Sequence, residues 1–315
     1  MAVGLRLPWE VANLRSEHQP VLGTVLTIHL RGWRGSRLLR AEATLLEAID
    51  RFESTFSAFR VDSELARWRV GGEVQKVSDD LGHLLRLALD WQHRSNGIFN
   101  PAAGLLSARW ARAEADQVLP SAEELLTLAG EIVEPRYTID GRTVTKLKGC
   151  SSLNFNAIAK GHVVDLAAHV VMEKHRLSTL LVNVGGDLVH VGEVPITVAI
   201  EDPHRPYDNE EPLTRVPICG QGLATSGGAR RGFQIQGRRY SHVLDSRTGQ
   251  PVDVVLSATV IGPDAATADV VATVASVLPP ADGTAFVDTI ENTSALVVGK
   301  ETVTSARWPQ TVTES

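Results

Sequence analysis

The sequence predicts an α+β fold rather than a doubly wound one, and three features of its 315 residues support this class. Long segments repeat apolar residues at helical spacing, whereas short β-rich segments bounded by glycine, asparagine or aspartate lie between and after them. The two kinds of segment do not alternate strictly, as they would around a parallel sheet. No internal repeat or clear linker divides the chain, whose length suits one large core or two moderate lobes.

One strand and three helices are predicted in the first half of the chain. Apolar and polar residues alternate over 20–30, which is typical of a strand. Leucine, isoleucine and phenylalanine at helical spacing predict a helix over 36–58, with Ser36 as its N-cap, and a second helix over 79–95. A Ser-x-x-Glu capping box predicts a short helix over 121–130.

Strands are more frequent in the second half. Residues 136–147 predict two strands around an Asp-Gly turn, and 156–175 predict a third long helix. Two strands then flank the Gly185-Gly186 turn, and short β segments continue to residue 263. The last predicted elements are a helix over 265–278, a shorter helix near 281–289 and a strand over 293–299.

The composition excludes several classes of protein. The chain is 43% hydrophobic and 22% charged, with a net charge of −6, which argues against a nucleic-acid-binding surface. Two cysteines are too few for a disulfide framework, and no Cys/His cluster suggests zinc. The N-terminus has no apolar segment of signal-peptide length, and no apolar stretch could cross a bilayer. We therefore expect a cytoplasmic protein with no membrane span.

Candidate metal-binding residues lie in the last long predicted helix. Asp269 and Thr273 are four positions apart, so their side chains project from one face. A carboxylate and a hydroxyl are hard oxygen donors, which suit Mg²⁺ better than a soft metal. The same residues also have an ordinary explanation, because an aspartate near a helix N-terminus is favourable and threonine is common on helix faces. The pattern alone leaves both interpretations open.

A second candidate site is the start of the helix predicted over 156–175. Asn-rich turns precede this helix, so its first backbone amides are available to a ligand. Lys160 lies near the helix start, where acidic residues are usually preferred. An anionic ligand explains this lysine better than helix stability does. Considered alone, the segment favours the simpler interpretation of a solvated lysine on an amphipathic helix.

Turns and one histidine complete the candidates. Asp187 follows the Gly185-Gly186 turn, where it could face a ligand or only cap its own turn. The segment 224–228 could surround a phosphate with amides and hydroxyls, although no Walker motif is present. His242 follows a probable strand end, and its reference pKa of roughly 6.5 suits proton transfer. It is one of ten histidines, and spacing alone does not distinguish it.

In this order, the motifs resemble the ApbE family of FAD:protein FMN transferases over roughly residues 20 to 300. The segments that carry the resemblance are Leu22-Gly23-Thr24, Phe56 to Leu65, Gly97 to Leu106, Asn154 to Asp165, Val182 to Asp187, Thr225-Ser226-Gly227, Tyr240 to Pro251 and Ala268 to Thr273. The resemblance implies a T-fold-like architecture of mixed sheets with packed helices and a ligand cleft between two lobes. We expect an N-terminal extension over 1–19, one domain over 20–300 and a flexible tail over 301–315.

The resemblance also implies roles for individual residues. Asp269 and Thr273 would hold Mg²⁺ together with a backbone carbonyl near Ala157, with Ala272 adjacent, and His242 and Asp269 would be catalytic. The implied FAD contacts are Leu22, Phe59, Ile98, Phe99, Asn100, Asn154, Lys160 and Val243. Several of these positions depart from the family pattern: Leu22 stands where methionine is usual, Asn100 and Asn154 where aspartate is usual, and Phe59 where tyrosine is usual.

The implied reaction is transfer of FMN from FAD to a Thr or Ser hydroxyl of an acceptor protein, with release of AMP. In it, Mg²⁺ and Lys160 would neutralise charge on the pyrophosphate, and His242 would accept the hydroxyl proton. Two alternatives remain open from the sequence. The protein could be an Mg²⁺-dependent FAD pyrophosphatase that forms FMN and AMP, or a protein that binds FAD without turnover, as the two asparagines suggest.

Overall fold

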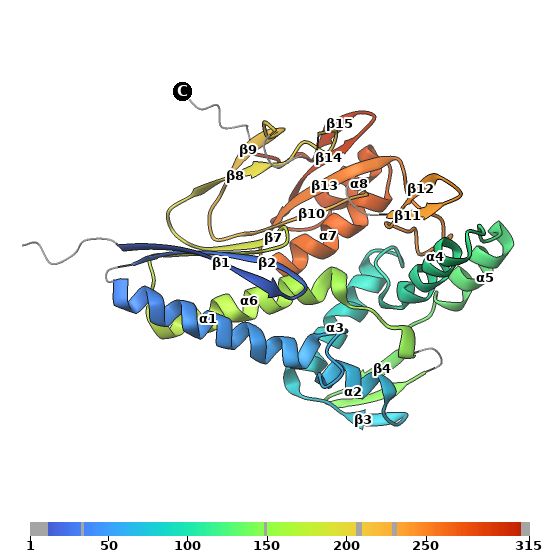
Figure 1. Cartoon of the computed structure of the whole chain (residues 1–315), viewed down its shortest axis with the longest axis horizontal. Coiled ribbons are helices and arrows are strands. Elements are labelled where there is room, and N and C mark those ends of the chain that lie inside the picture. Colours follow the sequence, from blue (N-terminus) through green and yellow to red (C-terminus); the bar gives the residue numbers. More distant parts are fainter. Residues whose placement is uncertain (1–11, 33–34, 148–149, 206–209, 229–231, 310–315) are drawn as a thin grey trace, which may run out of the picture.

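The computed structural model describes residues 12–32, 35–147, 150–205, 210–228 and 232–309. Its centre is an eight-stranded sheet with strands in the order β1 (Ala12–Val21), β2 (Thr24–Gly32), β6 (Thr179–Val184), β7 (Asp187–Gly192), β10 (Gly222–Ser226), β13 (Val255–Gly262), β14 (Ser294–Gly299) and β15 (Thr302–Thr304) (Figure 1). The predicted α+β class is confirmed. The expectation of mixed sheets is wrong, because every strand pairing in the described residues is antiparallel.

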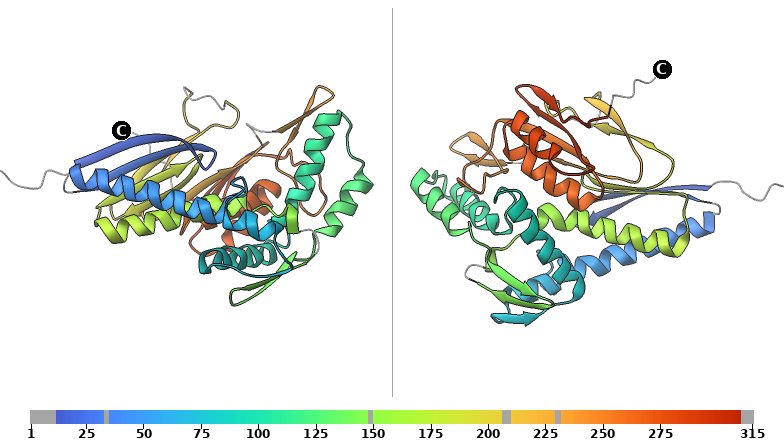
Figure 2. Two further views of the ribbon diagram at one scale, coloured as in Figure 1. Left: turned by 60° about the horizontal axis from the view of Figure 1, so that its bottom comes forward. Right: turned by 180° about the vertical axis from the view of Figure 1, so that it is seen from behind.

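Four helices cover one face of this sheet (Figure 2). They are α1 (Gly35–Phe56), α6 (Asn156–His175), α7 (Ala265–Val277) and α8 (Pro280–Asp288). Alternation in β2 turns Leu26, Ile28 and Leu30 toward this layer, and each is at most 2% exposed. Helix α6 packs against α1, α7 and the strands β6 and β7, so it is buried on several sides. Its N-terminal end therefore lies deep in the molecule, where the candidate site forms.

The opposite face of the sheet carries a second, smaller core. The hairpin of β8 (Ile196–Ile200) and β9 (Thr214–Ile218) covers it. Alternate residues of the central strands, among them Leu188, Leu223 and Ile261, point into this core, while their chain neighbours point toward the helices. The sheet is thus buried on both faces over β7, β10 and β13. This explains why most residues of these three strands are buried.

The remaining elements form a region at one end of the molecule, which we call the helical region (Figures 1 and 2). It contains α2 (Glu64–Val70), α3 (Asp79–Arg94), α4 (Gly104–Asp116), α5 (Ala122–Glu131), the short turns η1 (Pro101–Ala103) and η2 (Cys150–Ser152), and a small sheet of β3 (Val74–Lys76), β4 (Tyr137–Asp140) and β5 (Thr143–Lys146). A hairpin of β11 (Gly232–Ile235) and β12 (Arg238–Ser241) packs against α4.

Three predicted boundaries differ from the structure. Strand β1 begins at Ala12 and pairs with β2, so the expected extension over 1–19 is wrong from residue 12 onward. At the other end, β15 pairs with β14 and the Ser305 hydroxyl accepts a hydrogen bond from the Ala295 N–H at 2.8 Å, so the expected tail is partly ordered. Both strands are at sheet edges, where polar side chains are tolerated and hide the strand pattern. Helix α1 begins at Gly35, so Ser36 lies inside the helix and is not its N-cap.

Residues 1–11 and 310–315 lie outside the described residues. Among the helices that the structure describes, none is both long enough and apolar enough to cross a bilayer.

Candidate functional site

The site is built where the start of α6, the turn between β6 and β7, and the middle of α7 meet. The Gly185-Gly186 turn has positive φ at both glycines, +61° and +102°, and a Cβ on Gly185 would lie 2.7 Å from Thr24. This turn directs Asp187, the first residue of β7, into the interior, where it is 3% exposed. There Lys160, from the first turns of α6, forms a salt bridge with the Asp187 carboxylate.

The Lys160–Asp187 pair answers the question that the sequence left open for both residues. Asp187 does not only cap its own turn, and Lys160 is not simply solvated. A buried carboxylate is stable when a cation pairs with it. The partners are 27 positions apart, so no local pattern predicts their contact, and Asp187 was not among the predicted site residues.

Asp269 lies beside this pair. It is 7% exposed, and its Oδ2 atom has no hydrogen-bond partner in the structure. Burial raises the pKa of Asp269 well above its usual range, the negative charge of Asp187 raises it further, and Lys160 opposes this. Burial likewise raises the pKa of Asp187, against the effect of Lys160. The buried carboxyl groups of Asp187 and Asp269 thus both interact with the ammonium group of Lys160, which forms its salt bridge with Asp187.

This arrangement fits a divalent cation. An unpartnered buried carboxylate oxygen needs either a proton or a cation, because leaving it charged and unpaired is unfavourable. Thr273 follows one turn later on α7 and is half-buried. No cluster of three or more His, Cys, Asp and Glu residues occurs in the described part of the chain. The other ligands would therefore be hydroxyl, backbone carbonyl or water oxygens, which is the donor set that Mg²⁺ prefers.

Two further residues of the predicted metal set border the same place. Ala157 is in the first turn of α6 and half-buried, and Ala272 is fully buried on α7. Helices α6 and α7 pack directly on each other. The role of their backbone carbonyls as metal ligands stays a prediction.

Helix α7 is fastened to α6 by the carboxylate of Asp165, the last residue of the motif that begins at Asn154. The two oxygens of Asp165 accept hydrogen bonds from the N–H groups of Ala265 and Ala266, each at 2.9 Å. Asp264 caps the same helix by accepting from the Thr267 N–H at 2.6 Å. Burial raises the pKa of Asp165 to about 7, while the two backbone hydrogen bonds lower it. These contacts set where α7, and hence Asp269, stands relative to α6.

The close approach of the two helices depends on a glycine. A Cβ on Gly161 would lie 2.6 Å from the backbone carbon of Ala265, which no side chain could accommodate without a shift. Gly161 directly follows Lys160 in α6. Gly161 is therefore explained by packing, because the absence of a side chain lets α7 lie close to α6 next to Lys160.

The hydroxyls of the segment 224–228 are engaged within the fold. Thr225 bonds to Thr259 at 2.9 Å, and Ser226 bonds to Ser276 at 3.1 Å. The Ser276 hydroxyl also donates to the Thr273 carbonyl at 2.8 Å. These bonds tie β10 to β13 and to the end of α7 beyond Thr273. Contact between this segment and a phosphate stays a prediction.

His242 lies in a loop directly after β12 and is exposed. The loop is held tightly: the Val243 N–H donates to the Ser241 hydroxyl at 3.1 Å, and the Val243 carbonyl accepts from the Val252 N–H at 2.9 Å. A turn fixed by two hydrogen bonds between Arg247 and Asp245, at 2.8 and 2.9 Å, follows. The histidine is therefore presented on an anchored loop that is accessible to a substrate.

The segment 98–100 is joined to this loop but turns its side chains inward. The Ser246 hydroxyl donates to the Ile98 carbonyl at 3.1 Å. Ile98 and Phe99 are 7% and 3% exposed. Both polar atoms of the Asn100 amide are engaged within the fold, because its Nδ2 donates to the Ile132 carbonyl at 2.8 Å and its Oδ1 accepts from the Ala102 N–H at 2.9 Å. Contact of this segment with FAD stays a prediction.

Asn154 is placed differently from Asn100. Its side chain is exposed, and its Oδ1 accepts from the Asn156 N–H at 2.8 Å at the start of α6. Its backbone N–H donates to the Pro101 carbonyl at 2.7 Å, which joins the two asparagine segments. The outer face of Asn154 is thus free to meet a ligand.

Leu22 and Phe59 complete the predicted set. Leu22 lies in the tight turn between β1 and β2 with φ at +49°, and its neighbour Thr24 touches the Gly185 turn that positions Asp187. Phe59 follows α1 and is 78% exposed. The next residue, Arg60, bonds to Asp50 at 2.8 Å, which holds this loop. An exposed phenyl ring on an anchored loop can stack on a planar ligand.

Comparison with known proteins gives a consistent result. A family model described as the ApbE family matches residues 22–297. The FAD:protein FMN transferase of Rhodobacter capsulatus is 29% identical over 281 residues, which cover 87% of this chain and 53% of that protein, so the chain spans about half its length. The FAD:protein FMN transferase of Vibrio cholerae serotype O1 is 29% identical over 286 residues, covering 87% of this chain and 83% of that protein.

Solved structures show the same architecture. The apo flavinyl transferase ApbE of Pseudomonas stutzeri superposes with a TM-score of 0.78 and 25% identity, and the match covers 95% of each chain. The ApbE protein of Thermotoga maritima has a TM-score of 0.79 at 24% identity, covering 94% of this chain and 96% of that one. The second likeness concerns the fold alone.

Proposed function

The chain belongs to the ApbE family, and from this premise we propose that it is an Mg²⁺-dependent FAD:protein FMN transferase. It transfers FMN from FAD to a Thr or Ser hydroxyl of an acceptor protein and releases AMP. The observation that carries the proposal is the buried Asp269 carboxylate, whose Oδ2 lacks a partner beside the Lys160–Asp187 pair. A hydrolase or a passive flavin-binding protein would share parts of this site, and the experiment below separates the three.

The proposed binding mode places the FAD pyrophosphate over the start of α6 and the middle of α7. Asp269, Thr273 and backbone oxygens near Ala157 and Ala272 would hold Mg²⁺, which supplies Lewis-acid neutralisation of pyrophosphate oxygens when bound. We propose a T-fold-like arrangement in which FAD occupies a cleft between the sheet and the helical region. Phe59 would face the flavin from the loop after α1, where it is largely exposed.

In the proposed reaction the acceptor hydroxyl attacks the phosphorus on the FMN side of the pyrophosphate. A new P–O bond forms to the acceptor, the P–O bond to AMP breaks, and AMP leaves with the electron pair. His242 takes the proton of the attacking hydroxyl. Lys160 stabilises the negative charge that develops on the phosphate oxygens, as phosphoryl transfer requires.

The burial of the site supports this chemistry. Charges interact more strongly when water is excluded, so one lysine beside two buried carboxylates has a larger effect than a surface lysine has. Asp187 keeps Lys160 in place and charged. The exposed position of His242 suits a group that must meet a macromolecular substrate.

The test is incubation of the purified protein with FAD and Mg²⁺, with and without candidate acceptors that carry a Thr or Ser. We expect AMP release and covalent flavin fluorescence on the acceptor. AMP and free FMN without acceptor labelling would identify a pyrophosphatase instead. FAD binding without AMP release, unchanged by Asp269→Ala, would identify a non-catalytic flavin-binding protein.

The role of His242 is tested separately. We expect His242→Ala to retain FAD binding and to slow transfer by about 10²- to 10⁴-fold, because general-base catalysis typically contributes this much. His169→Ala is the matched control, since His169 is exposed and pairs only with Glu173 on its own helix. Wild-type turnover of the His242 variant would remove this residue from the mechanism.

A further inference from the structure

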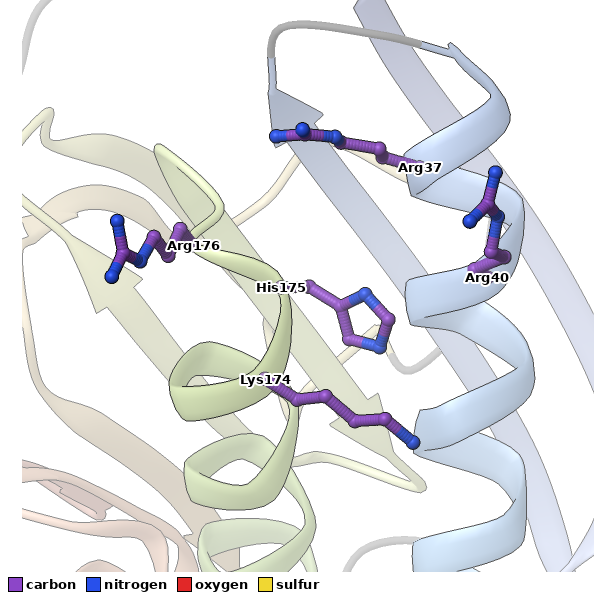
Figure 3. A pocket seen from close by; sticks show the side chains of 5 residues that line it. All are labelled: Arg37, Arg40, Lys174, His175 and Arg176. Atoms are coloured by element: carbon purple, nitrogen blue, oxygen red, sulfur yellow. The ribbon is translucent and has the colours of Figure 1, made fainter.

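A pocket lies at the opposite end of α6 from Lys160. It is open to solvent, has a volume of about 540 Å³ and lies between the beginning of α1 and the end of α6 (Figure 3). The residues that line it are Arg37, Arg40, Lys174, His175 and Arg176. Lys160 and Lys174 are separated by roughly 20 Å along the helix, at 1.5 Å per residue. The pocket is therefore distinct from the candidate active site.

The charges of this pocket are not neutralised by the protein. In the described part of the chain, no salt bridge involves Arg37, Arg40, Lys174 or Arg176. Elsewhere exposed arginines do pair, as Arg112 does with Asp116 at 2.7 Å.

The nearby carboxylates are engaged in other contacts. Glu42 of α1 contacts His18 at 3.0 Å, and Glu173 of α6 contacts His169 at 3.2 Å. Glu47 lines an adjoining groove with Lys174, but no salt bridge joins the two. A chain with a net charge of −6 thus concentrates four unpaired cations in one hollow.

Helix dipoles explain only half of this cluster. Lys174 and Arg176 lie at the C-terminus of α6, where cations are favourable. Arg37 and Arg40 lie in the first turns of α1, where the dipole is positive and cations are unfavourable, and the first turn contains no acidic residue. Figure 3 shows Arg37 extending from α1 toward the end of α6, whereas the Arg40 side chain points along α1. Local helix stability therefore gives no reason for the arginines of α1.

His175 lies at the side of the pocket, and its pKa responds to the positive charges around it. Its Nε2 is hydrogen-bonded to the Thr44 hydroxyl at 2.8 Å, which fixes the ring between the two helices. Burial lowers the pKa of His175, and the charges of Lys174 and Arg40 lower it further. An anion bound among these residues would raise this pKa.

We propose that this pocket is a binding site for a phosphate-bearing anion. Guanidinium groups match phosphate oxygens with paired donors. The N-terminus of α1 favours an anion, while the C-terminus of α6 opposes it, so the cationic side chains carry the attraction. No aromatic ring other than His175 lines the pocket, so recognition is through the anionic group rather than through stacking on a base. The phosphate belongs either to a small soluble ester or pyrophosphate, or to a lipid headgroup.

The test is a titration with sodium pyrophosphate in Mg²⁺-free buffer that contains a chelator. Binding is followed by calorimetry and by the NMR signal of the His175 ring. We expect the double variant Arg40→Ala/Lys174→Ala to bind at least about tenfold more weakly than wild type, because two charge-assisted contacts are lost. The double variant Lys76→Ala/Lys300→Ala removes the same charge from exposed positions elsewhere and should bind like wild type.

The source of the phosphate is decided by a second arm with vesicles. Sedimentation with phosphatidylglycerol vesicles but not with phosphatidylcholine vesicles, lost in the pocket variant alone, assigns the site to a lipid headgroup. Pyrophosphate binding without vesicle binding assigns it to a soluble phosphate compound. Equal weakening in both double variants, or no binding of either probe to wild type, overturns the proposal.

A further variant and a further measurement test the same site. Should the pocket variant unfold, Arg37→Ala serves in its place, because this exposed side chain makes no hydrogen bond in the described structure. A rise in the His175 pKa on saturation of the wild-type protein is an independent sign of occupancy. Neither readout depends on FMN transfer, so the proposed function can fail while this site stands.

Discussion

Asp165 and Ala265 join the two helices of the candidate metal site, because the Asp165 carboxylate on α6 accepts the Ala265 N–H at the start of α7 at 2.9 Å. The second oxygen of the same carboxylate accepts the next N–H, that of Ala266. One side chain thus satisfies two of the four N–H groups that a helix start leaves without partners. The position of Asp269, one turn further along α7, depends on this junction.

We expect Asp165→Ala to lower the free energy of unfolding by about 2–3 kcal/mol, since two buried N–H groups lose their acceptor. Asp165→Asn keeps one acceptor oxygen and should fall between wild type and the alanine variant. Both variants should also bind Mg²⁺ more weakly than wild type, because α7 is no longer held in register with α6. Denaturant unfolding and Mg²⁺ titration measure the two effects. Wild-type stability of Asp165→Ala would contradict the assigned role.

Asp269→Asn should separate function from stability. Without metal, Asp269 is a buried carboxyl group beside Asp187 with an unpartnered oxygen, and its raised pKa favours the neutral, protonated form. The neutral amide should therefore leave the free energy of unfolding within about 1 kcal/mol of wild type. The variant should lose both the stabilisation by Mg²⁺ with FAD and the release of AMP. Thermal unfolding with chelator, and then with Mg²⁺ and FAD, distinguishes these states. A metal-free variant much less stable than wild type would mean that Asp269 is structural.

Asn100→Asp and Asn154→Asp introduce an aspartate at the two positions where the resemblance implies one, and we expect opposite outcomes. At position 100 the Nδ2 group donates to the Ile132 carbonyl, so an aspartate would place two acceptors together and cost about 1–3 kcal/mol. At position 154 the side chain is exposed and only accepts a hydrogen bond at the start of α6, where a negative charge is favourable. Denaturant unfolding of the two variants is the measurement. An equal change in the free energy of unfolding for both variants would contradict the described difference between the buried amide of Asn100 and the exposed side chain of Asn154.

His162 should make the protein sensitive to acid. Its ring stacks on His83, with centroids 5.4 Å apart, and lies 5.3 Å from the ring of Phe56. Burial and, to a smaller extent, the charge of His83 lower the pKa of His162 to about 4, although Asp264 opposes this. The pKa of His162 in the folded state is thus below its value of about 6.5 in the unfolded state. Between about pH 4 and pH 6.5 the unfolded state therefore binds more protons than the folded state. Stability therefore falls as the pH decreases through this window.

We expect this single group to account for about 2 kcal/mol of the stability lost between pH 7 and pH 5. On acidification from pH 7 to pH 5, the free energy of unfolding of the His162→Leu variant should fall by about 2 kcal/mol less than that of wild type. Denaturant unfolding at the two pH values measures the difference. His169→Leu, on the exposed side of the same helix, is the control and should follow wild type. Identical acid sensitivity of His162→Leu and wild type would show that the imidazole is not the titrating group.

Local patterns predicted much of the fold and part of the site. Asp269 and Thr273 were correctly predicted to lie four apart on one helix, and the Gly185-Gly186 turn was predicted from its glycines. The edge strand β1 was missed because its exposed side carries charged residues, and no pattern indicated the sheet order. Asn100 was predicted as a ligand contact, but its buried amide is bonded to the Ile132 carbonyl, which is 32 positions away.

By itself, the sequence determined the six helices that carry a clear helical pattern, several turns and the family, because each depends on residues that are neighbours in the chain; α2 and α4 were not predicted. Only the tertiary structure decided that Lys160 pairs with Asp187, that Asp269 loses its solvent beside them, and that four cationic residues line one pocket with His175. The physical reason is that burial and ion pairing depend on which distant segments pack together. Short-range propensity carries no information about that packing.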